Sequence, residues 1–291
     1  MTGLAVAALL GALLPGAFAA PTDDAIARAM EGARGADLPA RVRMVTEPFL
    51  GAPYVLSPLG EGRGVDTDPT SRWDAFDCTT FVETAMALAL SDDLPAARHL
   101  LDTLRYRGGQ VEYLARRHFP EAEWIPELTA QGYLEDVTRL VGGDDVRVEE
   151  KRLDAKVWSR ARHQGMPALP PERIPVGTFR LDVWPLAAAR AGASRIPPGT
   201  ILHLVRVDYP SVPVRVSHQG LVLDKGGKLF LRHAADRMYH SVVDEPLDHF
   251  FARMQQYQKW PVVGVHLTRV RAPAAATVSP ASGAPPAAGG R

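Results

Sequence analysis

The sequence has almost no cysteine, no net charge and, after its first twenty residues, no long apolar run. Cys78 is the single cysteine among 291 residues, so no disulfide can form within the chain. Lys and Arg number 33, as do Asp and Glu, which excludes the global basic field that holds nucleic acid. We therefore expect no nucleic-acid partner and no stable membrane insertion of the mature chain.

The N-terminus carries the one pronounced apolar run, over residues 4–20. It is rich in Ala and Leu and ends in Ala17-Phe18-Ala19, a small-x-small pattern typical of signal-peptidase sites. We predict a signal peptide over residues 1–20 and an exported product, periplasmic or secreted. No Lys or Arg precedes the run, so a buried N-terminal helix is the alternative interpretation.

The two ends of the chain frame one predicted domain. Residues 272–291 are almost wholly Ala, Pro, Gly, Ser and Thr, a composition that buries too little apolar area to offset the entropy of ordering. We predict a disordered tail there. The hydrophobic content of 46% is enough for a sizeable core. We expect a single domain over residues 21–271.

The order of predicted elements indicates an α+β fold, because helices come first and strands afterwards. Apolar spacing and turn residues predict helices over 22–35, 38–50, 78–90, 92–106, 111–118, 131–140 and 151–164. Short runs rich in β-branched residues predict strands over 174–183, 200–207, 214–223, 228–232 and 262–270.

Cys78 lies at the start of the apolar helix predicted over 78–90. Asp77 is a good N-cap, which places Cys78 in the first helical turn, where free backbone N–H groups and the helix dipole favour an anion. We expect this position, together with a neighbouring imidazolium, to lower the thiol pKa from ~8.5 into the range ~3.5 to 7.5, as in cysteine nucleophiles. The alternative is an inert buried cysteine that packs as a small apolar side chain.

A cysteine nucleophile needs a base and a group that orients the base. His218 and His233 lie in two predicted strands joined at Gly226-Gly227. A two-residue turn there sets His233 opposite Gly220, which shares its face with His218. The two imidazoles are then diagonal neighbours. A zinc site that uses Cys78 and these histidines is the rival interpretation, but no short-spaced ligand pair is present to anchor a metal.

Several motifs in order resemble the bacterial N-acetylmuramoyl-L-alanine amidase-like family, which is related to the NlpC-type, papain-like peptidoglycan hydrolases. They are Gly51-x-Pro-Tyr54, Phe76-Asp-Cys-Thr-Thr-Phe-Val-Glu83, Pro198-Gly-Thr200, Ser217-His-x-Gly220 and Arg232-His-Ala234. The resemblance runs from about residue 51 to 270. It departs at Gln219, where such enzymes usually carry an apolar residue.

This resemblance implies a papain-like, NlpC-type core, in which the helix bearing the cysteine packs on an antiparallel sheet, with an inserted helical segment over about 92–195. By motif, Cys78 matches the nucleophile, His218 the general base and acid, and His233 the residue that orients His218. Tyr54 and Asp77 match positions beside the substrate and oxyanion. The implied substrates are peptidoglycan stem peptides or muropeptides, cleaved at an amide through a thioester without metal or cofactor.

Two other functions stay open at this stage. One is a catalytically inactive peptidoglycan-binding or scaffold protein with the same fold. The other is an acyltransferase that passes the same thioester to an amine acceptor.

Overall fold

The computed structural model describes residues 18–160 and 169–273. Residues 1–17 of the predicted signal peptide and 274–291 of the predicted tail lie outside this part of the chain. No helix within it is both long enough and apolar enough to cross a bilayer.

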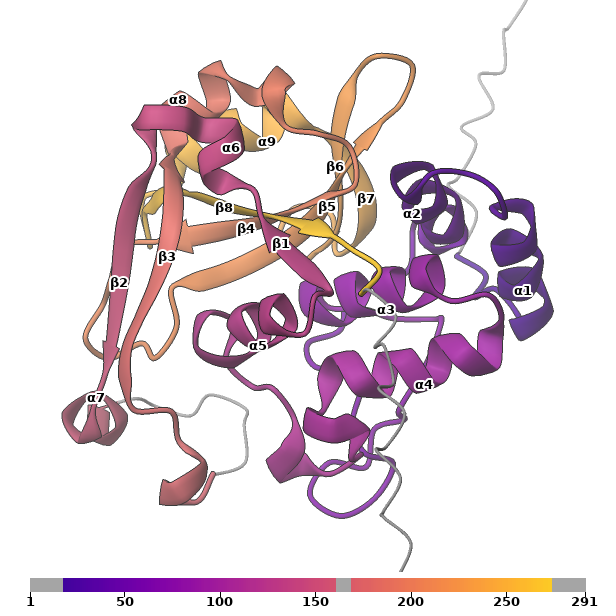
Figure 1. The fold of residues 1–291 in the computed structure, drawn as a ribbon, viewed down its shortest axis with the longest axis horizontal. Helices are drawn as coiled ribbons and strands as arrows, with labels where there is room; N and C mark the ends of the chain where they lie inside the picture. The colour runs from indigo at the N-terminus through magenta and orange to yellow at the C-terminus, as the bar shows by residue number, and fades with distance from the viewer. Residues whose placement is uncertain (1–17, 161–168, 274–291) are drawn as a thin grey trace, which may run out of the picture.

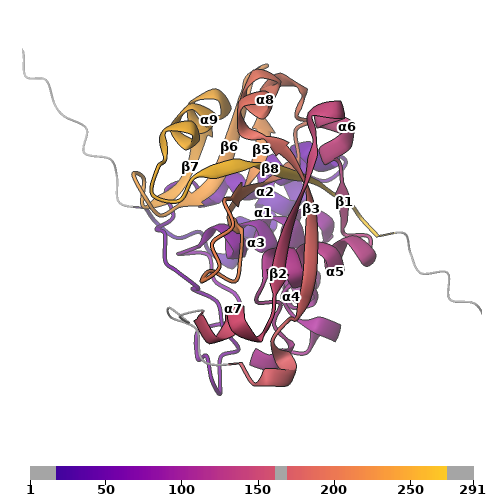
Figure 2. The ribbon, with the colours of Figure 1, turned by 90° about the vertical axis from the view of Figure 1, so that its left-hand side faces the viewer.

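The fold is α+β, as predicted, with helices on both faces of one antiparallel sheet (Figures 1 and 2). The helices are α1 Asp23–Gly32, α2 Leu38–Thr46, α3 Cys78–Leu90, α4 Leu94–Arg105, α5 Ile125–Ala130, α6 Thr138–Gly142, α7 Ala155–Arg160, α8 Leu186–Ala191 and α9 Leu247–Gln256. The strands are β1 Leu134–Asp136, β2 Arg147–Leu153, β3 Gly177–Pro185, β4 Thr200–Arg206, β5 Val216–Asp224, β6 Leu229–Ala235, β7 Ser241–Pro246 and β8 Val262–Val270.

The sheet runs in the order β2-β3-β8-β4-β5-β6-β7, and β1 pairs with β8. Strand β3 pairs with β8 only at Trp184 and Pro185, whereas it pairs with β2 along its whole remaining length. Strands β2 and β3 therefore leave the sheet as a two-stranded ribbon, with α7 near its far end (Figure 1).

Two apolar layers sandwich the sheet. One lies between the sheet and α1 to α5 and includes Phe81, Met86, Ile201 and Leu221. The other lies between the opposite face and α6, α8 and α9 and includes Phe250. The alternation along each strand sends successive side chains to opposite layers.

Helix α3 occupies the middle of the first layer, and its bounds match the prediction. Every residue from Thr80 to Ala89 is buried, so the helix is enclosed on all sides rather than along one apolar stripe. Neighbouring helices α2 and α4 and strands β5 and β6 surround it. A helix enclosed in this way is held at a fixed place against the sheet.

The predicted helical insertion over about 92–195 is mixed in structure. Strands β1, β2 and β3 lie within it, and the predicted helices over 131–140 and 151–164 give way partly to β1 and β2. The predicted helix over 111–118 contains only one 3₁₀ turn, Tyr113–Ala115. The predicted helix over 151–164 overlaps β2 at residues 151–153. The strand was not recognised because a charged residue, Lys151, lies on its buried face beside Leu153, so the sequence lacks apolar alternation.

Candidate active site

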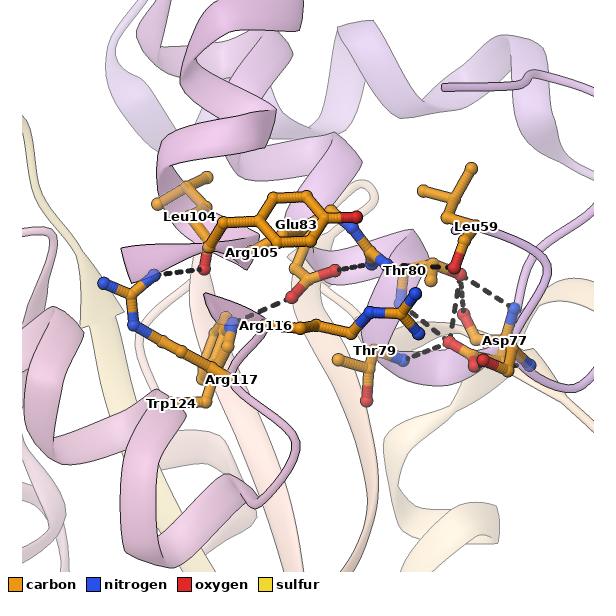
Figure 3. A network of polar contacts seen from close by, with 12 residues as sticks. Leu59, Asp77, Thr79, Thr80, Glu83, Leu104, Arg105, Arg116, Arg117 and Trp124 are labelled. Atoms are coloured by element: carbon orange, nitrogen blue, oxygen red, sulfur yellow. Dashed lines mark hydrogen bonds and ion pairs between the residues drawn. The ribbon is translucent and has the colours of Figure 1, made fainter. Parts of the chain in front are cut away.

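Asp77 fixes the start of α3 and hence the place of Cys78. Its carboxylate accepts hydrogen bonds from the backbone N–H groups of Thr79 (3.0 Å) and Thr80 (2.7 Å), and the Thr80 hydroxyl accepts from the Asp77 N–H (3.0 Å). This is the reciprocal capping box (Figure 3). Cys78 is thus the first helical residue, where backbone N–H groups have no partner within the helix.

A buried ion pair holds the next turn of α3 from behind. Glu83 accepts from Arg105 at 2.5 Å and from the indole N–H of Trp124 at 3.0 Å. Arg105 also donates to the Leu59 carbonyl at 3.1 Å (Figure 3). Because both charged side chains are almost fully buried, each depends on the other for compensation. The contacts tie α3 to α4 and to the loop that precedes Cys78.

One pocket brings four of the predicted site residues together. Cys78, His218, His233 and Tyr54 line the same cavity, which has an empty volume of about 670 Å³. Cys78 as a residue is partly exposed rather than sealed in the core. The backbone N–H of Gln219 donates toward its sulfur. The residue after His218 therefore meets Cys78 directly.

The turn at Gly226-Gly227 produces the predicted strand register. The Lys225 N–H donates to the Lys228 carbonyl, and Leu221 pairs with Arg232, so Gly220 lies opposite His233. A Cβ on Gly220 would come within 2.9 Å of the His233 Cβ. The prediction that the two imidazoles are neighbours is confirmed, since His218 Nε2 lies 2.7 Å from His233 Nδ1.

A β-bulge precedes His218. Strand β4 pairs Leu204 with His218 but Val205 with Val216, which leaves Ser217 as an extra residue in β5. Bulges bend a strand and redirect the side chains beside them. Here the bulge lies immediately before the histidine that reaches the pocket.

Glu245 extends the pair of imidazoles into a row of three groups. Its carboxylate lies 3.2 Å from His233 Nε2, an ion-pair distance at an angle that is poor for a straight hydrogen bond. Arg253 donates to the same carboxylate at 2.9 and 2.6 Å. Although burial opposes ionisation, contacts with His233 and Arg253 lower the Glu245 pKa to about 2. Glu245 is therefore ionised across the physiological range.

This charge assigns the protons on both imidazoles. An ionised carboxylate only accepts, so His233 carries its proton on Nε2 and its Nδ1 is an acceptor. The proton in the 2.7 Å contact then belongs to His218 Nε2. His218 Nδ1 keeps a free lone pair. His218 therefore has an unprotonated, basic nitrogen, and the next residue, Gln219, contacts the Cys78 sulfur.

The resting thiol and imidazole are both neutral, contrary to the thiolate predicted from the helix start. Burial, followed by the negative charge of Asp77, raises the Cys78 pKa to about 12. Burial, followed by the neighbouring His233, places the His218 pKa well below its ordinary value. The desolvation of the sulfur outweighs the attraction of the helix N-terminus.

Tyr54 and Asp77 differ in their relation to the pocket. The Tyr54 N–H donates to the His240 carbonyl at 2.9 Å, which fixes the tyrosine between β7 and the residues before α3. Burial raises the Tyr54 pKa well above its ordinary value, so its hydroxyl stays a donor. Asp77 does not line the pocket. Its carboxylate is engaged by the cap and by the Ser57 N–H, and its place beside the substrate stays a prediction.

A family model described as N-acetylmuramoyl-L-alanine amidase-like matches residues 44–256, which is more than half of the chain. The chain belongs to the N-acetylmuramoyl-L-alanine amidase-like family. This membership confirms the family predicted from the motifs and supports a hydrolase. No curated protein is similar enough in sequence to match this amidase-like chain.

Solved structures share the fold of this amidase-like protein. A Legionella pneumophila protein has a TM-score of 0.74 at 20% identity and covers 85% of this chain and 94% of its own. An N-acetylmuramoyl-L-alanine amidase from Bacteroides uniformis has a TM-score of 0.61 at 22% identity and covers 86% of this chain and 98% of its own. A Bacteroides fragilis protein named as a candidate xylanase has a TM-score of 0.60 at 25% identity and covers 76% and 97%.

Sequence reasoning missed two residues of this amidase-like site. Glu245 lies on β7, a strand that was not predicted, although Val242 and Val243 before it are the β-branched signal of one. Gln219, noted only as a departure, is buried and donates to the Thr79 hydroxyl at 2.9 Å. Within residues 18–160 and 169–273, no group of three His, Cys, Asp or Glu residues is placed to hold a metal ion.

Proposed function

We propose that the protein is a cysteine hydrolase that cleaves an amide of peptidoglycan stem peptides or muropeptides through a thioester. The observation that carries the proposal is the shared pocket of Cys78 and His218, with His218 bonded to His233. Family membership supports the substrate class. A helix with a cysteine at its start, packed on an antiparallel sheet that bears the histidine, also favours an NlpC-type, papain-like core.

In the proposed reaction, His218 Nδ1 takes the proton from the Cys78 thiol as the sulfur attacks the amide carbonyl. The carbonyl oxygen becomes negative, and the Cys78 N–H and Tyr54 hydroxyl are the donors proposed for it. The carbon–nitrogen bond then breaks, and the amine leaves with the proton from His218. Water, activated by the same nitrogen, hydrolyses the thioester and releases the thiol.

A neutral resting pair suits this general-base reaction. His218 becomes an imidazolium only while the thiol attacks. The negative charge of Glu245 stabilises this imidazolium through His233, which lies between the two groups. His233 and Glu245 are positioning residues in this proposal. The same neutrality is the observation that favours a second candidate, a protein that binds peptidoglycan without cleaving it, because a thiol with a pKa of about 12 is a weak nucleophile at rest.

A glycosidase, which the name of the Bacteroides fragilis protein would suggest, fits the pocket less well. Glycosidases usually flank the scissile bond with two carboxyl groups. Asp236 is the one carboxylate residue among the described residues that line this pocket. Glu245 is engaged by His233 and Arg253. An amide substrate and a thiol nucleophile are the better match.

The proposal extends to the boundaries of the mature protein. We propose cleavage of a signal peptide after about residue 20, export to the periplasm or medium, and one catalytic domain over residues 21–271. The apolar N-terminal run and the Ala/Pro-rich tail support these assignments.

The test is digestion of purified muropeptides by the parental protein and by Cys78→Ala and His218→Ala variants, followed by mass spectrometry. We expect a loss of about 10⁴-fold or more in kcat/KM for each variant. His99→Ala, an exposed histidine on α4, is the matched control and should retain full activity. Product masses identify the bond, either muramoyl to L-Ala or D-Glu to diaminopimelate. Identical products from the parental and Cys78→Ala proteins would favour the second candidate, a protein that binds peptidoglycan without cleaving it.

A further inference from the structure

The pocket contains a buried arginine that neither the fold nor the proposed reaction explains. Arg206 ends β4, lines the pocket with Cys78 and His218, and is only 9% exposed. Among the described residues, no carboxylate lies within ion-pair distance of it. Burying a guanidinium without a counter-charge is costly, since a buried charge normally has a paired anion. Its charge is therefore available to an anion that enters the pocket.

The contacts that Arg206 does make hold it in place but leave its charge uncompensated. Its Nε donates to the Ser217 hydroxyl at 2.6 Å, and one terminal nitrogen donates to the Trp260 carbonyl. The guanidinium also stacks over the rings of Tyr257 (4.6 Å) and Trp260 (5.4 Å). Within the described residues no acceptor engages Nη2, so the N–H donors of this nitrogen are left for a ligand.

A second arginine lies over the same tyrosine. The Arg237 guanidinium is 5.6 Å from the Tyr257 ring centroid, lines the same pocket and is exposed. It forms no ion pair with any described residue. The third arginine of the lining, Arg253, is neutralised by Glu245. Two uncompensated cations face one exposed carboxylate, Asp236, so this end of the pocket carries net positive charge.

The arginines are close to the reacting groups. Ser217, which Arg206 holds, directly precedes His218, and the positive charge of Arg206 contributes to the lowered pKa of His218. An anion bound to Arg206 would offset that charge and make His218 a stronger base. Recognition and proton transfer would then be coupled through one guanidinium.

We propose that Arg206 and Arg237 form a subsite for a carboxylate of the substrate, next to the scissile amide. This inference rests on the proposed function, because stem peptides carry free carboxylates beside their amide bonds. Arg206 is the buried, pre-positioned partner, and Arg237 adds charge at the rim. Carboxylates on D-Glu and on diaminopimelate share the required chemistry, so the two sources must be separated by experiment.

The experiment measures binding to the Cys78→Ala full chain, which needs no turnover. The probes are L-Ala-γ-D-Glu-diaminopimelate and two forms of it, amidated either at the D-Glu carboxylate or at the diaminopimelate carboxylates. We expect titration calorimetry to show that one amidated form binds about tenfold or more weakly than the free acid, because a charge-assisted contact is lost. The weakened form identifies the recognised carboxylate.

Variants assign the effect to the arginines. In Arg206→Gln the ratio of acid to amide affinity should fall to about one, and in Arg237→Gln it should fall part of the way. Arg152→Gln, an arginine 79% exposed on the β2–β3 ribbon, should keep the full ratio. If Arg206→Gln does not fold, as circular dichroism would show, Arg237→Glu decides: it should weaken the free acid about tenfold and leave the amidated form unchanged.

The results separate this inference from the proposed function. Equal affinity of all three peptides for the Cys78→Ala chain would overturn the subsite, as would an unchanged ratio in the folded Arg206 and Arg237 variants. Equal cleavage of acid and amide by the parental enzyme would overturn the subsite and keep the hydrolase. Discrimination in binding without any cleavage would keep the subsite and remove the hydrolase.

Discussion

Cys78 lies between two buried polar regions that are built in opposite ways. Behind α3, Glu83 and Arg105 form an ion pair at 2.5 Å, in which burial raises the Glu83 pKa and Arg105 opposes that rise. In front, His218 and His233 are neutral and in contact, and His233 Nε2 lacks a well-aligned hydrogen bond. The first region has no spare charge to exchange. The second consists of neutral imidazoles that can take up and return a proton. Fixed charges therefore position this helix, whereas neutral groups are left for chemistry.

The largest expected effect comes from the removal of one member of the ion pair. Glu83→Ala leaves Arg105 buried without a counter-charge and the Trp124 N–H without an acceptor. We expect the free energy of unfolding to fall by about 3–5 kcal/mol in urea denaturation. Glu150→Ala, in an exposed pair with Arg180, should cost at most about 1 kcal/mol. Similar losses in the two variants would contradict a structural ion pair.

The ionisation of Cys78 tests the neutral front region. A thiol pKa raised to about 12 keeps the thiolate fraction small at pH 7. We expect iodoacetamide to label Cys78 about 10²-fold more slowly at pH 7 than it labels a free cysteine, with a rate still rising above pH 9. The urea-unfolded chain is the control, because it has the same single thiol with an ordinary pKa. A labelling rate that levels off below pH 8 would instead indicate a resting thiolate.

Glu245 tests whether charge reaches His218 through His233. Glu245→Gln keeps the size of the side chain but removes its charge, and we expect kcat for muropeptides to fall by about 10- to 10²-fold with little change in KM. Asp248→Asn, an exposed change at the start of α9, should leave kcat unaltered.

The pH profile separates this electrostatic effect from a structural one. Because the His218 pKa is lowered, the parental enzyme should lose activity only below about pH 6.5, as His218 becomes protonated. The charge of Glu245 raises that pKa, so Glu245→Gln should move the acid limb to still lower pH. An acid limb that stays in place would show that Glu245 acts through packing alone.

The smallest expected effect concerns Gln219, which links the sheet to the first turn of α3. Gln219→Leu removes the 2.9 Å hydrogen bond to Thr79 but also removes a buried carbonyl oxygen that lacks a well-aligned hydrogen bond among the described residues. The two changes oppose each other, so we expect unfolding to become easier by about 1 kcal/mol or less. Thermal denaturation measures it. A loss above about 3 kcal/mol would show that Gln219 supports the core rather than one contact.

The sequence alone was sufficient where a local rule matched the fold. Asp77 as N-cap defined the start of α3, and the two glycines after Lys225 defined the β5–β6 register and hence the meeting of His218 with His233. Both rules depend on residues within a few positions of each other. The family could likewise be identified from short motifs in order, and residues 44–256 match its model.

Prediction failed where the deciding contacts come from distant parts of the chain. The thiolate expectation considered the helix N-terminus but not the burial that α3 acquires from the sheet and its neighbouring helices. Strand β7 has only the two β-branched residues Val242 and Val243 before Asp244 and Glu245, and this short signal was missed together with the carboxylate behind His233. The roles assigned to Cys78, His218, His233 and Tyr54 stay predictions for the experiments above.

Gly220 contributes to the site because it has no side chain. Because this position carries only a hydrogen atom, the rings of His218 and His233 have room to approach each other across the two strands. Even one methyl group would act as a wedge against the Cβ of His233 and the side chain of Leu231. A substitution at this position should therefore affect proton transfer by His218, even when the sheet still folds.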